Sequence, residues 1–268
     1  MAGIVGKDTQ WFAKRFLPQD GLVWLFDPDN LDCYKPSGTV YSLQNTTAMT
    51  GFNIGSSGNN NNSLNIPTGV TFIQDNRGSK LLLNNNTITF YNDTLTNIVF
   101  PITMGIWSHA ENGYQGTHNA LLLGGGNYQN TLYHSLRIDL AGPSLIYYTT
   151  NSDSTLTSIS LPNTMTQLGI NSAQPLFFTI SISGTQQNPQ TIMGINNYFF
   201  RRTSSNWTNL IEINNLPSPS PSRINGYDNL QWKVSPTFKM GIAFVYNRAL
   251  TDIELSGIFQ ATRYRYGV

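Results

Sequence analysis

The sequence predicts an all-β protein in which antiparallel strands form two packed sheets, followed by one short C-terminal helix. Short apolar or alternating segments recur between clusters of Gly, Asn, Pro and Ser, a pattern typical of strands joined by turns. Only 11% of the residues are charged, so Asn, Thr, Ser and Gln must cover the surface. These residues favour turns and solvated strand faces over helix interiors. The length of 268 residues fits one large β-domain.

The chain opens with a segment that we expect to be an N-terminal arm, residues 1–18, ahead of a domain at residues 19–268. The arm's large apolar side chains are Trp11, Phe12, Phe16 and Leu17. Aromatic side chains in a terminal segment need a surface to cover them. Two interpretations stay open: the arm packs on its own domain, or these side chains bind a neighbouring protein.

Eleven segments have the length and apolar pattern of strands. They are residues 22–26, 69–73, 80–83, 88–91, 102–107, 120–123, 135–139, 144–148, 176–182, 191–193 and 238–246. A set of this size favours two sheets packed face to face. We expect residues 51–65 and 216–225 to be long loops of the same domain, because similar strands continue on both sides. Residues 124–127, Gly-Gly-Gly-Asn, predict a tight connection between strands.

The C-terminal helix is predicted by its start signal. Thr251 and Glu254 have the spacing of a capping box, in which the hydroxyl accepts a bond from the amide three residues on and the carboxylate reaches back. Ile253, Ile258 and Phe259 then supply apolar positions up to Ala261.

Charge and cysteine content exclude several classes of function. The net charge is +1 and the basic residues are scattered, which disfavours nucleic-acid binding. No stretch approaches the roughly 18 apolar residues of a membrane span, and the first residues lack the apolar core of a signal peptide. The single cysteine, Cys33, has no internal partner and is expected to be a small buried apolar residue.

Three segments carry a more specific resemblance. Residues 241–255, Gly-Ile-Ala-Phe-Val-Tyr-Asn-Arg-Ala-Leu-Thr-Asp-Ile-Glu-Leu, are followed by Tyr264-Arg-Tyr266. They resemble the end of laminin-G-like and pentraxin-like domains of the concanavalin A-like lectin/glucanase superfamily. Residues 21–27 and 102–107 resemble its opening strand and a strand from its middle. The resemblance spans about residues 20–268 and implies a jelly-roll β-sandwich.

The resemblance also implies a function, because short members that end in Arg-Tyr-Gly are frequent in structural proteins of bacterial viruses. We therefore expect a non-enzymatic virion component, either a capsid decoration or a part of a fibre or tail. It would be made in the host cytoplasm, bound to other virion proteins by its arm, and assembled as a homo-oligomer. The alternative is a carbohydrate-binding lectin module that recognises host-surface glycans.

Catalytic patterns are missing from the sequence. Retaining glycosidases need two carboxyl groups about 5–5.5 Å apart, and the glucanase branch takes them from a Glu-x-Asp-x-x-Glu strand. The glutamates are Glu111, Glu212 and Glu254, and none has that spacing. The histidines are His109, His118 and His134, whose spacing matches no zinc pattern. We expect no catalytic residues and no enzymatic activity.

Calcium is the cofactor that the resemblance leaves open, since related domains hold it with Asp and Asn oxygens in loops. Candidate ligands are Asp75, Asn76 and Asp139. The simpler interpretation is that these residues form turns, so no required cofactor is expected.

Glycan binding would depend on loop aromatics that stack on sugar rings. The candidates are Tyr114, Tyr128, Trp207 and Tyr227. The alternative is that these rings fill the core or contact a protein neighbour.

Overall fold

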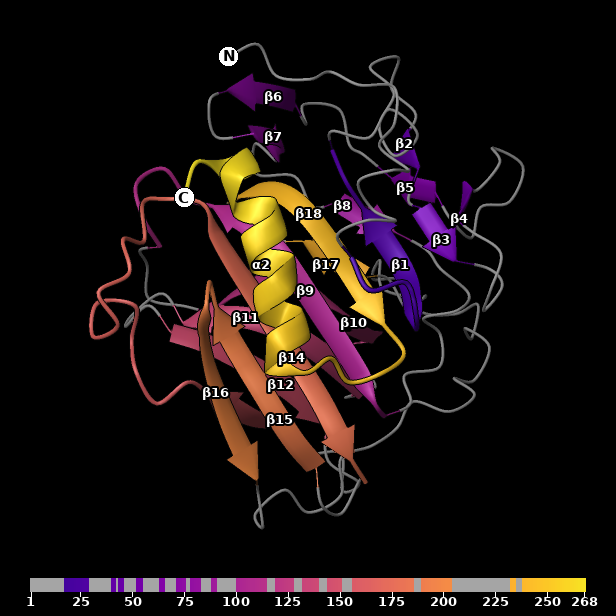
Figure 1. Ribbon diagram of the computed structural model, residues 1–268, viewed down its shortest axis with the longest axis vertical. Helices are drawn as coiled ribbons and strands as arrows, with labels where there is room; N and C mark the ends of the chain where they lie inside the picture. The colour runs from indigo at the N-terminus through magenta and orange to yellow at the C-terminus, as the bar shows by residue number, and fades with distance from the viewer. Residues whose placement is uncertain are drawn as a thin grey trace.

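A computed structural model describes most of the strand-forming parts of the chain and the C-terminal helix (Figure 1). The described residues are 17–28, 40–41, 43–45, 52–54, 63–65, 71–75, 78–82, 88–90, 100–114, 119–127, 132–139, 144–150, 156–185, 189–203, 232–234 and 238–268. Within them the chain forms two antiparallel sheets and one helix, which confirms the predicted all-β sandwich.

The first sheet has the strand order β16-β15-β14-β9-β18-β1-β3-β4, and the β6-β7 hairpin joins it where β7 pairs with β18. Its strands are β1 (Leu22–Phe26), β3 (Leu43–Asn45), β4 (Phe52–Ile54), β6 (Thr71–Asp75), β7 (Gly78–Leu82), β9 (Ile102–His109), β14 (Leu176–Gly184), β15 (Pro189–Ile195), β16 (Tyr198–Thr203) and β18 (Lys239–Tyr246).

The second sheet has the order β13-β12-β11-β10-β17-β8-β5-β2. Its strands are β2 (Val40–Tyr41), β5 (Ser63–Asn65), β8 (Ile88–Phe90), β10 (Asn119–Asn127), β11 (Leu132–Asp139), β12 (Ser144–Thr150), β13 (Leu156–Ser160) and β17 (Trp232–Val234). The helix α2 (Asp252–Tyr266) lies across β9, β14 and β18, while β10, β11 and β12 lie behind them (Figure 1).

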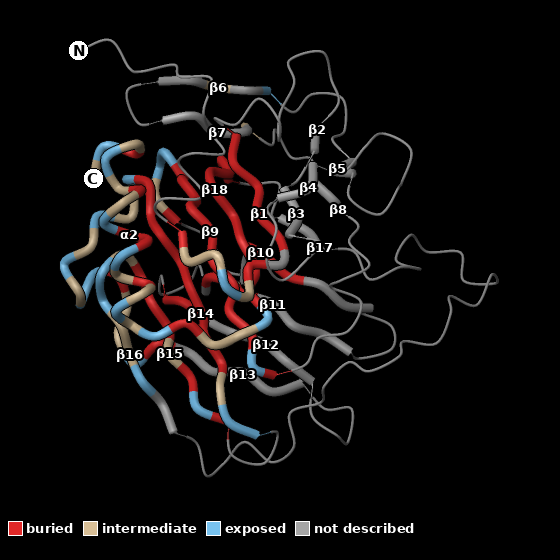
Figure 2. Tube along the Cα trace, turned by 45° about the vertical axis from the view of Figure 1, so that its right-hand side comes forward, coloured by how far each residue is buried: buried red, intermediate tan, exposed pale blue. Residues whose placement is uncertain are grey.

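The central strands of the first sheet are covered on both faces (Figure 2). Trp107 of β9 stacks on Phe259 and Tyr266 of α2, whereas its neighbour Ile106 is fully buried on the opposite face. Every residue of β9 and β18 is buried. This double burial explains why these strands read as almost continuous apolar runs instead of alternating ones.

The predicted helix is confirmed, including its capping box. Thr251 accepts a bond from the amide of Glu254 at 3.2 Å, and the Glu254 carboxylate accepts one from the Thr251 amide at 2.9 Å. The helix runs beyond the predicted limit at Ala261 and ends at Gly267, whose φ of 69° suits a glycine. Among the described residues, no helix is long and apolar enough to cross a membrane.

Each of the eleven predicted strands overlaps a strand of the structure, but other parts of the prediction were wrong. Residues 51–65, predicted as a loop, include β4 and β5. Residues 124–127 continue β10 and pair with β11 instead of forming a turn, because tertiary pairing outweighs the weak strand preference of glycine. The strands β2, β3, β13, β16 and β17 were not predicted.

Candidate functional site

The structure corrects one residue of the proposed partner-binding arm. Leu17 is only 4% exposed and belongs to the domain's own core, so it is not available to a neighbouring protein. Its carbonyl accepts a 2.7 Å bond from the side chain of Gln19, which fixes the entry into β1. The remaining arm residues, Trp11, Phe12 and Phe16, lie outside the described residues.

The structure also corrects one residue of the predicted glycan site. Tyr114 is 1% exposed and packs edge-on against Phe178 at 5.6 Å and against Phe238 at 4.8 Å. Burial raises the pKa of its hydroxyl well above the ordinary value. A ring enclosed in this way cannot stack on a sugar. Tyr128, Trp207 and Tyr227 lie outside the described residues.

The candidate calcium ligands lie on separate sheets. Asp75 ends β6 in the first sheet and pairs with Gly78, whereas Asp139 ends β11 in the second sheet and pairs with Ser144. Asn76 lies outside the described residues. Within the described ranges, no three His, Cys, Asp or Glu side chains gather closely enough to hold a metal ion.

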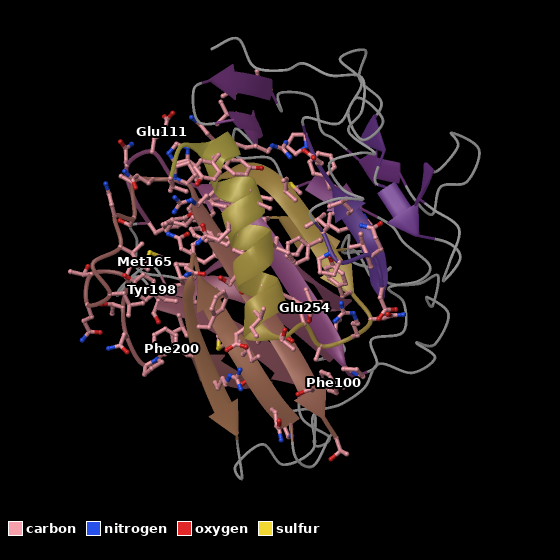
Figure 3. The ribbon with its side chains drawn as sticks, viewed as in Figure 1. Phe100, Glu111, Met165, Tyr198, Phe200 and Glu254 are labelled. Atoms are coloured by element: carbon pink, nitrogen blue, oxygen red, sulfur yellow. The ribbon has the colours of Figure 1, made fainter. Side chains whose placement is uncertain are left out.

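The described glutamates lie at opposite ends of α2 (Figure 3). Glu254 caps the start of the helix, beside Arg248 and the first residues of β9. Glu111 follows the end of β9 and forms an ion pair with the buried Lys239. The six residue steps from Thr103 to His109 span roughly 20 Å of strand, so these carboxylates cannot flank one glycosidic bond.

The histidines show no joint site in the described part of the chain. His109 is buried, and its Nε2 lies 3.2 Å from the carbonyl of Ala173, a contact that joins the end of β9 to the segment before β14. His134 lies in β11 and pairs with Thr149 of β12. His118, together with Glu212 and Cys33, lies outside the described residues.

Two loops meet where β9 ends and β14 begins, at one end of the first sheet. We term the surface that they form, residues 110–113 and 162–174, the loop face. Gly113 has a φ of 74°, and a Cβ there would lie 2.8 Å from the Ser172 hydroxyl, so glycine allows the loops to approach closely. Met165 is 1% exposed and anchors the second loop in the core. Thr164 and Gln167 bond each other's backbone amides at 3.3 and 2.8 Å. The two loops of the loop face are thus held in place by close packing, by the buried Met165 and by hydrogen bonds.

The exposed side chains of the loop face are mostly neutral amides. They are Asn112, Gln167, Asn171 and Gln174. The side-chain oxygens of Gln167 and Asn171 already accept backbone bonds, at 2.8 and 3.0 Å. No described residue bonds the side-chain amides of Asn112 and Gln174. Each of these two amides therefore offers a donor and an acceptor, which suits a ligand rich in hydroxyl groups.

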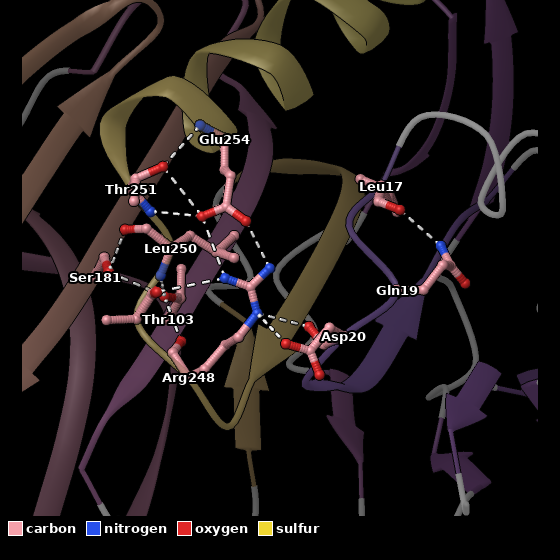
Figure 4. Close-up of polar contacts among 10 residues, drawn as sticks. Leu17, Gln19, Asp20, Thr103, Ser181, Arg248, Leu250, Thr251 and Glu254 are labelled. Atoms are coloured by element: carbon pink, nitrogen blue, oxygen red, sulfur yellow. Dashed lines mark hydrogen bonds and ion pairs between the residues drawn. The ribbon is translucent and has the colours of Figure 1, made fainter. Parts of the chain in front are cut away.

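A different polar cluster occupies the opposite end of the sheet (Figure 4). Arg248 makes a bidentate pair with Glu254, with contacts of 2.6 and 3.2 Å, and its Nε donates to the carbonyl of Asp20 at 2.8 Å. The Arg248 guanidinium, in hydrogen-bond contact, lowers the pKa of Glu254. Thr103 accepts a 2.8 Å bond from the amide of Leu250. This cluster ties β1, β9 and α2 together and has a structural role.

Comparison by sequence finds no relatives: no protein-family model matches the chain, and no curated protein matches it. Many solved structures are similar in fold, among them three with TM-scores of 0.50 to 0.54. A mutant of HCR/D has a TM-score of 0.54 and 9% identity, covering 84% of this chain and 52% of its own. The binding domain of botulinum neurotoxin DC in complex with rat synaptotagmin II has a TM-score of 0.51 and 12% identity, covering 85% and 52%. The ligand-binding domain of serotype D in complex with N-acetylneuraminic acid has a TM-score of 0.50 and 11% identity, covering 83% and 50%.

The chain spans about half the length of these toxin domains. At 9 to 12% identity the likeness establishes the fold. The described structure is an antiparallel β-sandwich whose fold is similar to that of the botulinum neurotoxin DC binding domain and of the serotype D ligand-binding domain.

Proposed function

We propose that the chain is a non-enzymatic binding module that recognises glycans on a cell surface. The observation that carries the proposal is the fold match, which covers 85% of this chain with the binding domain of botulinum neurotoxin DC. One similar structure is in complex with N-acetylneuraminic acid, and another is in complex with rat synaptotagmin II. A lectin-like module is thus the function for which this sandwich has solved counterparts.

The loop face is the surface that we propose for the ligand. The amides of Asn112 and Gln174 can donate to and accept from sugar hydroxyls, and the neighbouring Glu111 adds a carboxylate that is 64% exposed. The supports of the loop face, Met165 in the core and His109 against Ala173, hold these groups in place before the ligand arrives. Preorganisation of this kind limits the entropy lost on binding.

The ring that would stack on the sugar does not come from Tyr114, which is buried. We propose Tyr128, Trp207 and Tyr227 for this contact. Apolar contact with a ring face adds affinity that amides alone do not provide. Calcium held by Asp75, Asn76 or Asp139 remains part of the same proposal, since oxygen ligands suit this cation.

A glycan array tests this proposal. The full chain is applied with calcium and with a chelator, and bound protein is read by fluorescence. We expect at least one structurally related group of glycans to bind above background. The absence of any binder under both conditions would contradict the proposal, while binding lost with the chelator would assign a role to calcium.

A virion role is our second proposal, supported by the resemblance of residues 241–255 to laminin-G-like and pentraxin-like domains, whose short members with Arg-Tyr-Gly, here residues 265–267, are frequent in structural proteins of bacterial viruses. Trp11, Phe12 and Phe16 would attach the chain to other virion proteins, with the sandwich displayed outward. A glycan-binding module on a virion surface would combine both proposals.

Deletion of residues 1–16 tests the arm, because it leaves the buried Leu17 in place. The truncated chain should keep the unfolding midpoint of the full chain and lose incorporation into particles. Normal incorporation of the truncated chain would contradict the attachment role.

A further inference from the structure

We propose that the chain forms a two-fold symmetric dimer in which α2 packs antiparallel against α2 of a second copy. The proposal does not depend on glycan binding. It arises from the outer side of α2, which is the foremost element over the first sheet (Figure 1) and is exposed along its length (Figure 2).

Four exposed residues form a single line along this helix, which we term the outer stripe: Ile253, Gly257, Gln260 and Tyr264. Their spacing of i, i+4, i+7 and i+11 places them on one face. Ile253 is 81% exposed and Tyr264 is 75% exposed. Among the described residues only one other large apolar side chain is exposed, Tyr198 on β16. Two of the three exposed large apolar side chains among the described residues therefore lie on one helix face.

Close packing within the described part of the domain does not require the glycine in the outer stripe. A Cβ at Gly257 would meet no atom within 4 Å, and a glycine inside a helix costs about 1 kcal/mol relative to alanine. Gly241 differs, because a Cβ there would lie 2.5 Å from the Tyr266 hydroxyl. A close helix-to-helix approach from outside gives Gly257 the steric role that its own domain does not.

The outer stripe is self-complementary when two copies pack antiparallel. Its midpoint lies between Gly257 and Gln260, and Ile253 and Tyr264 are about 16 Å apart along the axis. In an antiparallel pair, Ile253 of one copy faces Tyr264 of the other, and Gly257 faces Gln260. A small residue thus meets a larger one in the middle, and aliphatic and aromatic side chains meet at both ends.

The charges at the helix ends favour the antiparallel arrangement over the parallel one. At the N-terminal end the three carboxylates of Asp252, Glu254 and Asp20 share two guanidinium groups, those of Arg201 and Arg248, so one negative charge is in excess. At the other end, no described carboxylate pairs with Arg263, whose guanidinium lies 4.9 Å from the Tyr264 ring. Antiparallel packing brings the end of one copy that carries Asp20 to the end of the other that carries Arg263, with opposed helix dipoles.

The contact area limits the strength of this dimer. A stable interface buries about 800 Å² on each partner, and one 15-residue helix provides only part of that area. We therefore expect a dissociation constant on the order of 10 μM.

Sedimentation equilibrium of the full chain over a wide concentration range is the first test. We expect a monomer–dimer equilibrium that Ile253→Ser or Tyr264→Ser weakens by about tenfold. Tyr198→Ser is the matched control, because it removes an exposed aromatic outside the outer stripe and should leave the equilibrium unchanged. A monomer at every concentration, or a dimer unaffected by the stripe variants, would overturn the proposal.

Gly257→Gln separates a dimer contact from an effect on folding. The space above Gly257 is open, so glutamine should raise the unfolding midpoint of the monomer while it weakens the dimer by about tenfold. If the variant lost its dimer because it folded poorly, the unfolding midpoint and the dimer affinity would both fall. An unchanged or stronger dimer in this variant would contradict the close approach at Gly257.

Cross-linking tests the direction of the helices in a Cys33→Ser background. A mixture of the Ile253→Cys and Tyr264→Cys variants should oxidise to a disulfide-linked dimer. Each variant alone should form little disulfide-linked dimer. Cross-linking within each variant alone would indicate parallel helices and overturn the antiparallel arrangement. Failure of the mixture to cross-link would also count against it.

Discussion

Trp107 and Thr262 are joined by a 2.8 Å hydrogen bond that crosses the interface between β9 and α2. The indole Nε1 donates to the Thr262 hydroxyl, which in turn donates to the carbonyl of Ile258 at 2.7 Å. Both side chains are at most 1% exposed. The bond therefore fixes the helix on the sheet at a point that water does not reach.

Thr262→Val should destabilise the domain, because it keeps the side-chain shape but leaves the buried indole N–H without its acceptor. We expect a loss of about 1–3 kcal/mol in the free energy of unfolding. Denaturant titration measures it, with the exposed Thr166→Val as a control expected to stay within about 0.5 kcal/mol. Equal stability of both variants would show that the bond contributes nothing.

Gly241→Ala and Gly257→Ala should change stability in opposite directions. At Gly241 the added methyl would lie 2.5 Å from the Tyr266 hydroxyl, which accepts a 2.8 Å bond from the amide of Ile242. We expect a loss of about 1–3 kcal/mol there and a gain of about 0.5–1 kcal/mol at Gly257. Thermal unfolding at low protein concentration gives both values; a destabilised Gly257→Ala monomer would contradict the open space above that glycine.

Acid should remove the contribution of the ion pair between Arg248 and Glu254. The pair lowers the pKa of Glu254 below its ordinary 4.5, so the stabilisation is present above about pH 5 and is lost as the pH falls through the lower folded value. Glu254→Gln should therefore be less stable than the natural chain at pH 7, with the difference shrinking toward about pH 3. Urea titrations across this range test it, and a difference that does not vary with pH would disprove the ionic origin.

Alkali should act through Tyr246, whose hydroxyl is buried without a hydrogen-bond partner among the described residues. Burial raises its pKa above the ordinary 10.0, so the stabilisation is present below pH 10 and is lost as the pH rises further. Tyr246→Phe should match or exceed the natural chain in stability at pH 7 and lose less above about pH 10. Unfolding curves at pH 7 and near pH 11 check this; equal losses in both proteins would refute it.

Local patterns in the sequence were sufficient to predict eleven of the described strands and the helix. The capping box at Thr251 and Glu254 involves residues three apart, so its signal lies entirely within one short segment. The central strands of the first sheet were also predicted, because burial on both faces makes them long apolar runs. Their pairing order and the position of α2 depend on contacts between distant segments and did not follow from the sequence.

The site residues were harder to predict for the same reason. Tyr114 was expected on a surface because it lies in an apparent loop of the sequence, yet its neighbours in space, Phe178 and Phe238, are more than 60 residues away along the chain. The strand β16 was missed although Asn196, with a φ of 54°, occupies a turn position that asparagine tolerates. The dipeptide Asn196-Asn197 between the two strands was the local signal that could have identified the β15–β16 hairpin.

The loop face is the central claim about function, and one measurement tests it most directly. The natural chain, the double variant Asn112→Ala/Gln174→Ala and the control Gln190→Ala, an exposed amide at the far end of β15, are compared on the same glycan array. We expect the natural chain and the control to share one binding pattern and the double variant to lose it by at least about tenfold. Binding by the double variant at the natural level would place the ligand elsewhere, and no binding by any of the three would contradict the glycan-binding function itself.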